Sequence, residues 1–90
     1  MKVAKRFVVR GRVQGVGYRY FAVTCAQALG VCGWARNTPE GAVEVHAEGD
    51  EEQLQSFAFD LSRGPRYARV SLVDAHDVPL EGHTDFRASH

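Results

Sequence analysis

Two stretches of this sequence carry apolar residues at helical spacing, and each lies between stretches whose apolar residues alternate. A helix with one apolar stripe must bury that stripe, and an alternating strand offers an apolar face for it to pack on. The chain therefore favours helices laid on a sheet. The stripes are Tyr18, Phe21, Ala22, Cys25, Ala26 and Leu29, then Leu54, Phe57, Ala58 and Leu61.

The order of these elements predicts the fold class. Strands are expected over residues 5–13, 31–37, 42–48 and 68–78, and a short fifth edge strand is allowed at 84–88. The resulting order is βαββαβ, which predicts an α+β fold, a ferredoxin-like two-layer α/β sandwich with a mostly antiparallel sheet. A chain of 90 residues supports one core, so residues 1–90 are expected to form a single domain.

Turn and capping residues stand between the predicted elements. Gly30 is suited to close the first helix, and Thr38-Pro39-Glu40-Gly41 has Pro and Gly where a tight turn needs them. Asp50 with Gln53 forms a capping box before the second helix, which Gly64-Pro65 ends.

The strands also predict which side chains are buried. In the third strand, Val43, Val45 and Ala47 alternate with Glu44, His46 and Glu48, so the second face of the sheet is expected to be solvated. In the fourth strand Val70 and Leu72 are expected to share a face. The aromatic residues Trp34, Tyr20 and Phe21 are expected in the core rather than as stacking groups.

Net charge is zero, so overall basicity does not argue for nucleic acid or a membrane as partner. The charges are nevertheless polarised along the chain. Residues 1–36 hold bases and no acid, and residues 37–62 hold acids and no base. Either the first third builds a site that attracts an anion, or two oppositely charged segments lie side by side.

The cysteines and histidines do not have the spacing of a redox pair or a metal site. Cys25 and Cys32 fit neither CxxC nor a zinc half-site, and are expected to be free thiols in a reducing, cytoplasmic compartment. The four histidines share no short spacing and are expected to be solvated, with no metal bound. No segment has the length of a signal-peptide core or of a membrane span.

The segment with the clearest chemical content runs from Gly11 to Arg19. Gly15 and Gly17 stand where a strand turns into a helix, so the backbone can curl and direct several N–H groups into one concavity that suits an anion. Arg19 lies in the first helical turn, where the positive end of the helix dipole makes a cation unfavourable. Binding of an anion would account for an arginine at this position. The plainer alternative is a tight connection with a solvated arginine. A Walker loop and a GxGxxG loop are both excluded, because Tyr20 stands at the third glycine position and no Lys-Ser/Thr pair follows.

Three segments carry a resemblance to a known family: Gly11-Arg-Val-Gln-Gly-Val-Gly-Tyr-Arg19, Leu29-Gly-Val-Cys-Gly-Trp-Ala-Arg-Asn-Thr38, and Gly41 before a Val-Glu-Val strand. The chain resembles an acylphosphatase over nearly its whole length. The resemblance implies hydrolysis of the carboxyl-phosphate bond of small acyl phosphates, giving a carboxylate and inorganic phosphate, without metal or cofactor. It implies that Arg19 binds the phosphate and Asn37 positions the attacking water. It also implies that a backbone amide loop cradles the phosphoryl oxygens, formed by Gln14, Gly15, Val16, Gly17 and Tyr18.

The chemistry of acyl phosphates agrees with such a site. The leaving group is a carboxylate whose conjugate acid has a pKa of about 4, so it needs no general acid. The loose transition state needs fixed donors around its oxygens, which amides and one guanidinium supply. The loop after the first strand and the end of the second strand can meet in this topology, so Arg19 and Asn37 are expected to converge.

The same fold also serves other functions. An RNA-recognition domain needs aromatics on the open face of its central strands, where this chain has Glu44, His46 and Glu48, and a copper chaperone needs a CxxC. A domain of a larger maturation protein and a regulatory module that binds an anion without turnover remain open. The chain is expected to act as a monomer.

Overall fold

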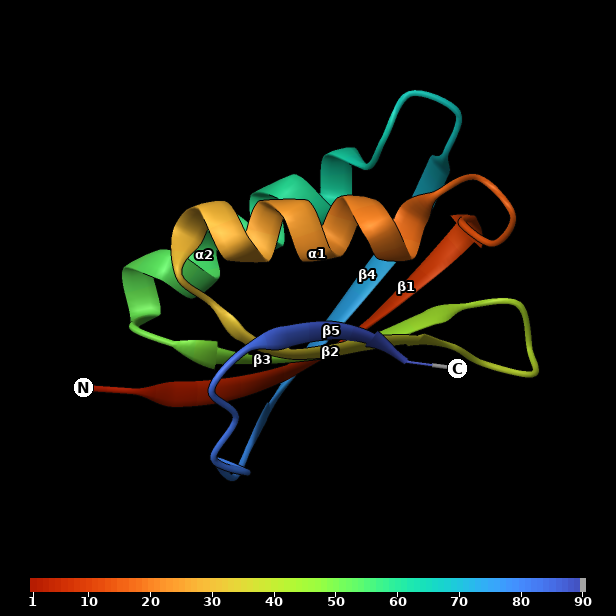
Figure 1. Cartoon of the computed structure of the whole chain (residues 1–90). Coiled ribbons are helices and arrows are strands. Elements are labelled where there is room, and N and C mark those ends of the chain that lie inside the picture. Colours follow the sequence, from red (N-terminus) through yellow and green to blue (C-terminus); the bar gives the residue numbers. More distant parts are fainter. Residues whose placement is uncertain (90) are drawn as a thin grey trace.

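The computed structural model describes residues 1–89, which form a two-layer α/β sandwich (Figure 1). Both helices lie on one side of a single sheet, as the two apolar stripes predicted. The predicted fold is confirmed, including the fifth strand. The elements are β1 (Val3–Arg12), α1 (Tyr18–Leu29), β2 (Cys32–Asn37), β3 (Val43–Gly49), α2 (Glu51–Arg63), β4 (Arg69–Val78) and β5 (Phe86–Ser89).

The sheet has the strand order β4-β1-β3-β2-β5. The three pairings among β4, β1, β3 and β2 are antiparallel, and β5 pairs in parallel with β2. The sheet is therefore mixed but mostly antiparallel. The parallel strand brings the C-terminal segment alongside β2 and beneath α1, as Figure 1 shows.

The core lies between the helices and the sheet. Phe57 of α2 packs edge-on against Phe7 of β1 and Phe86 of β5, with ring centroids 6.2 and 5.6 Å apart. Burial of each such side chain contributes about 1.5–3 kcal/mol. The predicted caps are present: Gly30 ends α1 in the left-handed conformation, and Asp50 with Gln53 forms the capping box of α2. Neither helix is long and apolar enough to cross a membrane, among the residues described.

The prediction that Val70 and Leu72 share a face is wrong, because a β-bulge interrupts β4. Gly11 pairs with Val70 and Arg10 pairs with Leu72, so Ser71 between them is an extra residue. A bulge shifts the alternation of the strand by one position. Val70 and Val73 pack against the core, whereas Leu72 is 51% exposed.

The charge polarity of the sequence produces ion pairs across strands. Glu44 of β3 accepts hydrogen bonds from Arg6 of β1 at 3.1 Å and from Arg36 of β2 at 2.7 Å. The three strands are neighbours in the sheet, so the oppositely charged segments do lie side by side. Arg19 takes no part in these ion pairs with Glu44, so the prediction that the first third of the chain builds an anion site is a separate question.

The second face of the sheet is not fully solvated, contrary to prediction. His46 and Glu48 of β3 are 0% and 1% exposed, although both point away from the helices. The connection between β4 and β5 crosses this face and covers them: Glu48 accepts hydrogen bonds from the backbone N–H groups of Glu81, Gly82 and His83. Burial opposes ionisation of Glu48, but these hydrogen bonds and one to His46 outweigh it and lower its pKa to about 2.

The aromatic predictions also need correction. Trp34 lies on this second face, where its indole stacks on the His46 imidazole with ring centroids 5.8 Å apart. Tyr20 is 77% exposed, and only Phe21 packs partly against the core. Consecutive residues of β2 point to opposite faces of the sheet. Ala35 therefore faces the core, whereas Trp34 faces away from the helices and packs on the buried His46.

We expect Glu48→Gln to destabilise the chain by about 2–3 kcal/mol, because an amide N–H₂ group would face backbone donors and leave them unpaired. In a domain of this size that loss lowers the Tm by roughly 10–20 °C. Thermal unfolding followed by circular dichroism measures it. Glu40→Gln changes the net charge equally in an exposed turn and serves as the control. Equal melting of both variants would show that Glu48 does not hold the connection.

Candidate active site

The connection between β1 and α1 is built around two glycines. Gly15 and Gly17 have φ angles of 74° and 78°, in the left-handed region that side chains disfavour. A Cβ atom at either position would meet nothing within 4 Å, so the space beside them is open. Gly17 is the N-cap of α1, and within the described chain no side chain caps this helix and no acid stands in its first turn. The first amide groups of α1 are thus left as donors beside open space.

Arg19 is held at this helix start by the last strand. Its Nη1 donates to the carbonyl oxygen of Ser89 in β5 at 2.6 Å. The acceptor is a neutral carbonyl rather than a carboxylate, so this contact orients the guanidinium without neutralising its charge. The parallel pairing of β5 with β2 is what brings Ser89 to the start of α1.

Asn37 is the last residue of β2 and is exposed. The hairpin turn after it forms as predicted, with the Gly41 N–H donating to the Thr38 carbonyl at 3.1 Å. Asn37 and Arg19 line one cavity of about 280 Å³, so the expected convergence of these residues is confirmed. The described residues that line it are Val13, Gly15, Gly17, Tyr18, Arg19, Tyr20, Asn37 and Ala88.

The side chain of Gln14 has a position that the sequence did not suggest. Its Nε2 donates to the carbonyl oxygens of Thr38 at 2.9 Å and Ala42 at 2.8 Å. It thereby joins the glycine loop to both ends of the hairpin turn that follows Asn37. Sequence reasoning considered only the backbone amide of Gln14, because the partners lie 24 and 28 residues away.

The remaining loop residues differ in what they present to the cavity. Tyr18 is 1% exposed, and its hydroxyl donates to the Leu61 carbonyl at 2.6 Å. Burial raises the pKa of this phenol well above its ordinary value, so it stays protonated and its hydroxyl remains bonded to the Leu61 carbonyl. Val16 packs partly against the core, and neither Val16 nor Gln14 lines the cavity.

The cavity is equipped to bind an anion. Arg19 supplies a positive charge, and the start of α1 adds unpaired amides and the positive end of the helix dipole. The arrangement can hold a phosphoryl group and position a water molecule, and among the described residues no carboxylic acid, histidine or lysine lines it to serve as a general acid.

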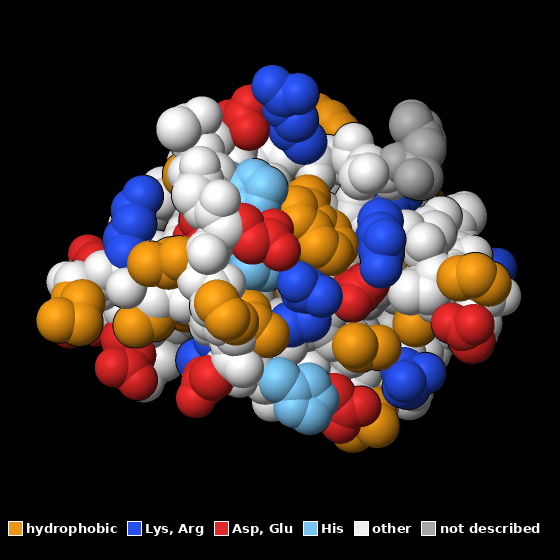
Figure 2. Space-filling model, turned by 90° about the horizontal axis from the view of Figure 1, so that it is seen from below, with side chains coloured by type: hydrophobic (Ala, Val, Ile, Leu, Met, Phe, Trp, Pro, Cys, Tyr) orange, Lys and Arg blue, Asp and Glu red, His pale blue; other side chains and the backbone are white. Residues whose placement is uncertain are grey.

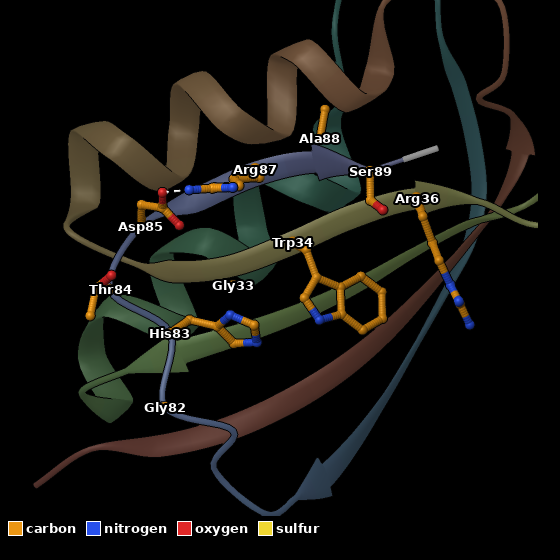
Figure 3. A pocket seen from close by; sticks show the side chains of 10 residues that line it. All are labelled: Gly33, Trp34, Arg36, Gly82, His83, Thr84, Asp85, Arg87, Ala88 and Ser89. Atoms are coloured by element: carbon orange, nitrogen blue, oxygen red, sulfur yellow. Dashed lines mark hydrogen bonds and ion pairs between the residues drawn. The ribbon is translucent and has the colours of Figure 1, made fainter.

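Three larger cavities lie elsewhere in the described chain, and two of them adjoin the strands that carry Asn37 and Ser89. One of about 400 Å³ is lined by Asn37 itself together with Arg10, Arg36 and the hairpin turn. Another, of about 670 Å³, lies beside β5 and the connection before it, with Trp34 and His83 projecting on the same side (Figure 3). None of the three contains the glycine loop or Arg19, so size alone would locate the wrong site.

Comparisons with known proteins agree with this site. The acylphosphatase family model matches residues 5–88. An acylphosphatase from Bifidobacterium longum is 50% identical over 78 residues, covering 87% of this chain and 80% of its own. The crystal structure of acylphosphatase from Bacillus subtilis superposes with a TM-score of 0.95 at 38% identity, covering all of both chains.

The same domain also occurs inside a longer protein. The crystal structure of T. kodakarensis HypF matches with a TM-score of 0.86 at 30% identity, covering 99% of this chain but 12% of its own. The family-model match spans nearly the whole chain, and relatives that are similar in length carry the same name. The chain belongs to the acylphosphatase family of enzymes.

Proposed function

We propose that this chain hydrolyses the carboxyl-phosphate bond of small acyl phosphates without a metal ion, in the cavity shared by Arg19 and Asn37. The observation that carries the proposal is that one cavity is lined by the glycine loop, the guanidinium and the carboxamide together. The glycine loop and Asn37 are separated in sequence by α1 and by the rest of β2. Their common location supports a reaction in which phosphate binding and water positioning happen at one point.

The phosphoryl group binds at the start of α1. The backbone amides of Gly15, Gly17 and Tyr18, which line the cavity, and the guanidinium of Arg19 donate to its oxygens. These donors stabilise the charge that the oxygens carry in the loose transition state. The Ser89 carbonyl limits the freedom of the Arg19 side chain, so less conformational entropy is lost when the substrate binds.

The water molecule attacks from the side of Asn37. The carboxamide oxygen accepts a hydrogen bond from water, and the carboxamide N–H₂ donates to a phosphoryl oxygen. A phosphorus–oxygen bond forms to the water, and the bond to the acyl oxygen breaks with its electron pair leaving on the carboxylate. The water protons pass to solvent and the phosphate product. Because the carboxylate is a weak base, no side chain needs to protonate it.

We expect the purified chain to hydrolyse benzoyl phosphate in excess EDTA. We also expect hydrolysis of glycerol 1-phosphate to be slower by a factor on the order of 10³, since an alkoxide leaving group requires the general acid that this cavity lacks. Release of inorganic phosphate measures both rates. Comparable rates would contradict the mechanism. A folded chain that turns over neither substrate would instead support a module that binds an anion without hydrolysing it.

We propose that Gln14 is a positioning residue that sets the distance between the glycine loop and Asn37. Gln14→Met keeps the size of the side chain and removes both hydrogen bonds to the turn. The expected result is a kcat lower by a factor of about 10 with KM changed less, because small misplacements of reacting groups slow the chemical step. Gln27→Met on the exposed side of α1 is the control. A rise in KM alone would assign Gln14 to substrate binding.

We further propose that the chain acts as a single-domain monomer in the reducing environment of the cytoplasm. The free thiols of Cys25 and Cys32 support the reducing compartment. Sedimentation of the purified chain tests the oligomeric state.

A further inference from the structure

A second group of side chains able to carry chemistry lies on the face of the sheet opposite the helices. Figure 2 shows that histidine and acidic side chains gather there beside a hydrophobic patch. His46 of β3 and Glu81 and His83 of the β4–β5 connection each offer one potential ligand atom, and all three atoms lie within 4.8 Å of one another. None of the three lines the cavity of Arg19 and Asn37.

The spacing of these atoms suits a transition-metal ion. His83 Nε2 lies 2.7 Å from Glu81 Oε1, and His46 Nε2 lies 3.6 Å from the same oxygen. Ligands of a tetrahedral zinc ion, each about 2.0–2.2 Å from the metal, are separated from one another by about 3.4 Å. Small rotations of the exposed Glu81 and the half-buried His83 side chains would therefore open the group enough to admit an ion. Two imidazoles and a carboxylate favour Zn²⁺ over Mg²⁺ or Ca²⁺.

Neighbouring groups hold the ligands in place. Trp34 stacks on His46, and its indole N–H donates to Glu81 Oε1 at 3.2 Å. Glu48 accepts hydrogen bonds from the backbone around Glu81 and His83, which keeps the connection over the strand. These contacts already order the ligand side chains when the chain folds. Binding of an ion therefore costs little further conformational entropy.

Arg6 is the neighbour that competes with an ion. Its Nη2 lies 3.3 Å from His46 Nδ1, and a guanidinium only donates, so Nδ1 accepts and Nε2–H donates to Glu48 at 2.8 Å. Binding of an ion at Nε2 requires the imidazole proton on Nδ1 instead. It also replaces the hydrogen bond from Nε2 to Glu48, whose carboxylate then faces the ion. Arg6 keeps its ion pair with Glu44 at 3.1 Å when its contact with Nδ1 is lost. The competition implies moderate rather than very tight affinity.

We propose that His46, Glu81 and His83 form a binding site for Zn²⁺ or a similar transition-metal ion, which clamps the β4–β5 connection onto the sheet. Solvent completes the coordination, since Glu81 and His83 are 42% and 30% exposed and leave one side accessible. The ion acts on stability rather than hydrolysis, because the site lies outside the catalytic cavity. The connection leads into β5, whose Ser89 orients Arg19, so clamping also steadies that strand.

Titration of the metal-free chain with zinc chloride in a buffer without chelators tests the proposal by calorimetry. One ion per chain with a micromolar Kd is expected, together with a higher Tm in its presence. His83→Gln and Glu81→Gln alter side chains that are not fully buried and leave the backbone donors to Glu48 in place. Each is expected to weaken binding at least tenfold. Replacement of His46 is avoided, because that side chain is fully buried and its loss would also destabilise the fold.

Two control variants identify the ligands. His76→Gln removes an exposed histidine of β4 that is not one of the three proposed ligands. Cys32→Ser removes the thiol of the β2 residue that pairs with Glu48 of β3. Both are expected to bind zinc as the original chain does. Absence of binding, equal affinity in His83→Gln, or loss of binding in Cys32→Ser would overturn the proposal. Hydrolysis of benzoyl phosphate in EDTA tests the catalytic site separately, so failure of one proposal does not imply failure of the other.

Discussion

Arg19→Gln should lower kcat/KM for benzoyl phosphate by a factor of about 10³ or more, the range seen when a guanidinium is removed from a phosphoryl-transfer site. The neutral amide can still donate a hydrogen bond but cannot balance the charge on the phosphoryl oxygens. Arg19→Lys should recover little, because an ammonium cannot donate in the forked geometry of a guanidinium. Initial rates of phosphate release at benzoyl phosphate concentrations well below KM measure kcat/KM for each variant.

The control for Arg19 is Arg66→Gln, which makes the same charge change at an exposed position near Tyr67. Its kcat/KM should stay within about twofold, since Arg66 does not line the cavity and solvent screens the charge of an exposed side chain. Circular dichroism should show both variants folded, because the Arg19 contact with Ser89 is one partly exposed hydrogen bond. A folded Arg19→Gln chain that retains full activity would remove Arg19 from the site.

Asn37→Ala is expected to lower kcat by a factor on the order of 10²–10³ while KM changes much less, because the carboxamide is the group that orients the water but only one of several donors to the phosphoryl oxygens. Asn37→Asp should be no better, since a carboxylate at the cavity would repel the phosphoryl oxygens. Full progress curves over a range of benzoyl phosphate concentrations separate the two constants. Both variants should fold, because Asn37 is exposed at the end of β2.

The matched control for Asn37 is Gln55→Ala, which shortens an exposed carboxamide on α2 away from the cavity. Unchanged kinetics are expected for it. If Asn37→Ala raised KM and left kcat intact, the carboxamide would belong to phosphate binding, and the water would need another positioning group. That outcome would contradict the role proposed for Asn37 and would not affect the role proposed for Arg19.

Local patterns predicted most of the fold. The helical stripes, the turn at Thr38–Gly41 and the capping box of Asp50 with Gln53 depend on residues within one or two turns of each other, and all appear in the structure. The bulge at Ser71 escaped prediction because its cause is a pairing with Gly11, about sixty residues away. A Cβ at Gly11 would collide with the Arg69 carbonyl, so the close approach that accompanies the bulge depends on that glycine.

The candidate site was predicted in part. The glycine loop and Arg19 are adjacent in sequence, and their chemistry can be read there. Their meeting with Asn37 was expected from topology, and the cavity that they share bears it out. The side-chain role of Gln14 and the Ser89 carbonyl that holds Arg19 depend on contacts across the fold, and no local pattern indicated them.

The amino-acid sequence by itself determined the elements, their order, the amphipathic faces and the residues of the glycine loop, because these follow from periodicity and from the conformational freedom of each residue. Only the tertiary structure decided what covers the second face of the sheet. His46 and Glu48 have the alternation of solvated residues, yet the β4–β5 connection buries them. A polar side chain can be buried wherever distant groups satisfy its hydrogen bonds, and the positions of those groups are set by the fold rather than by neighbours in the chain.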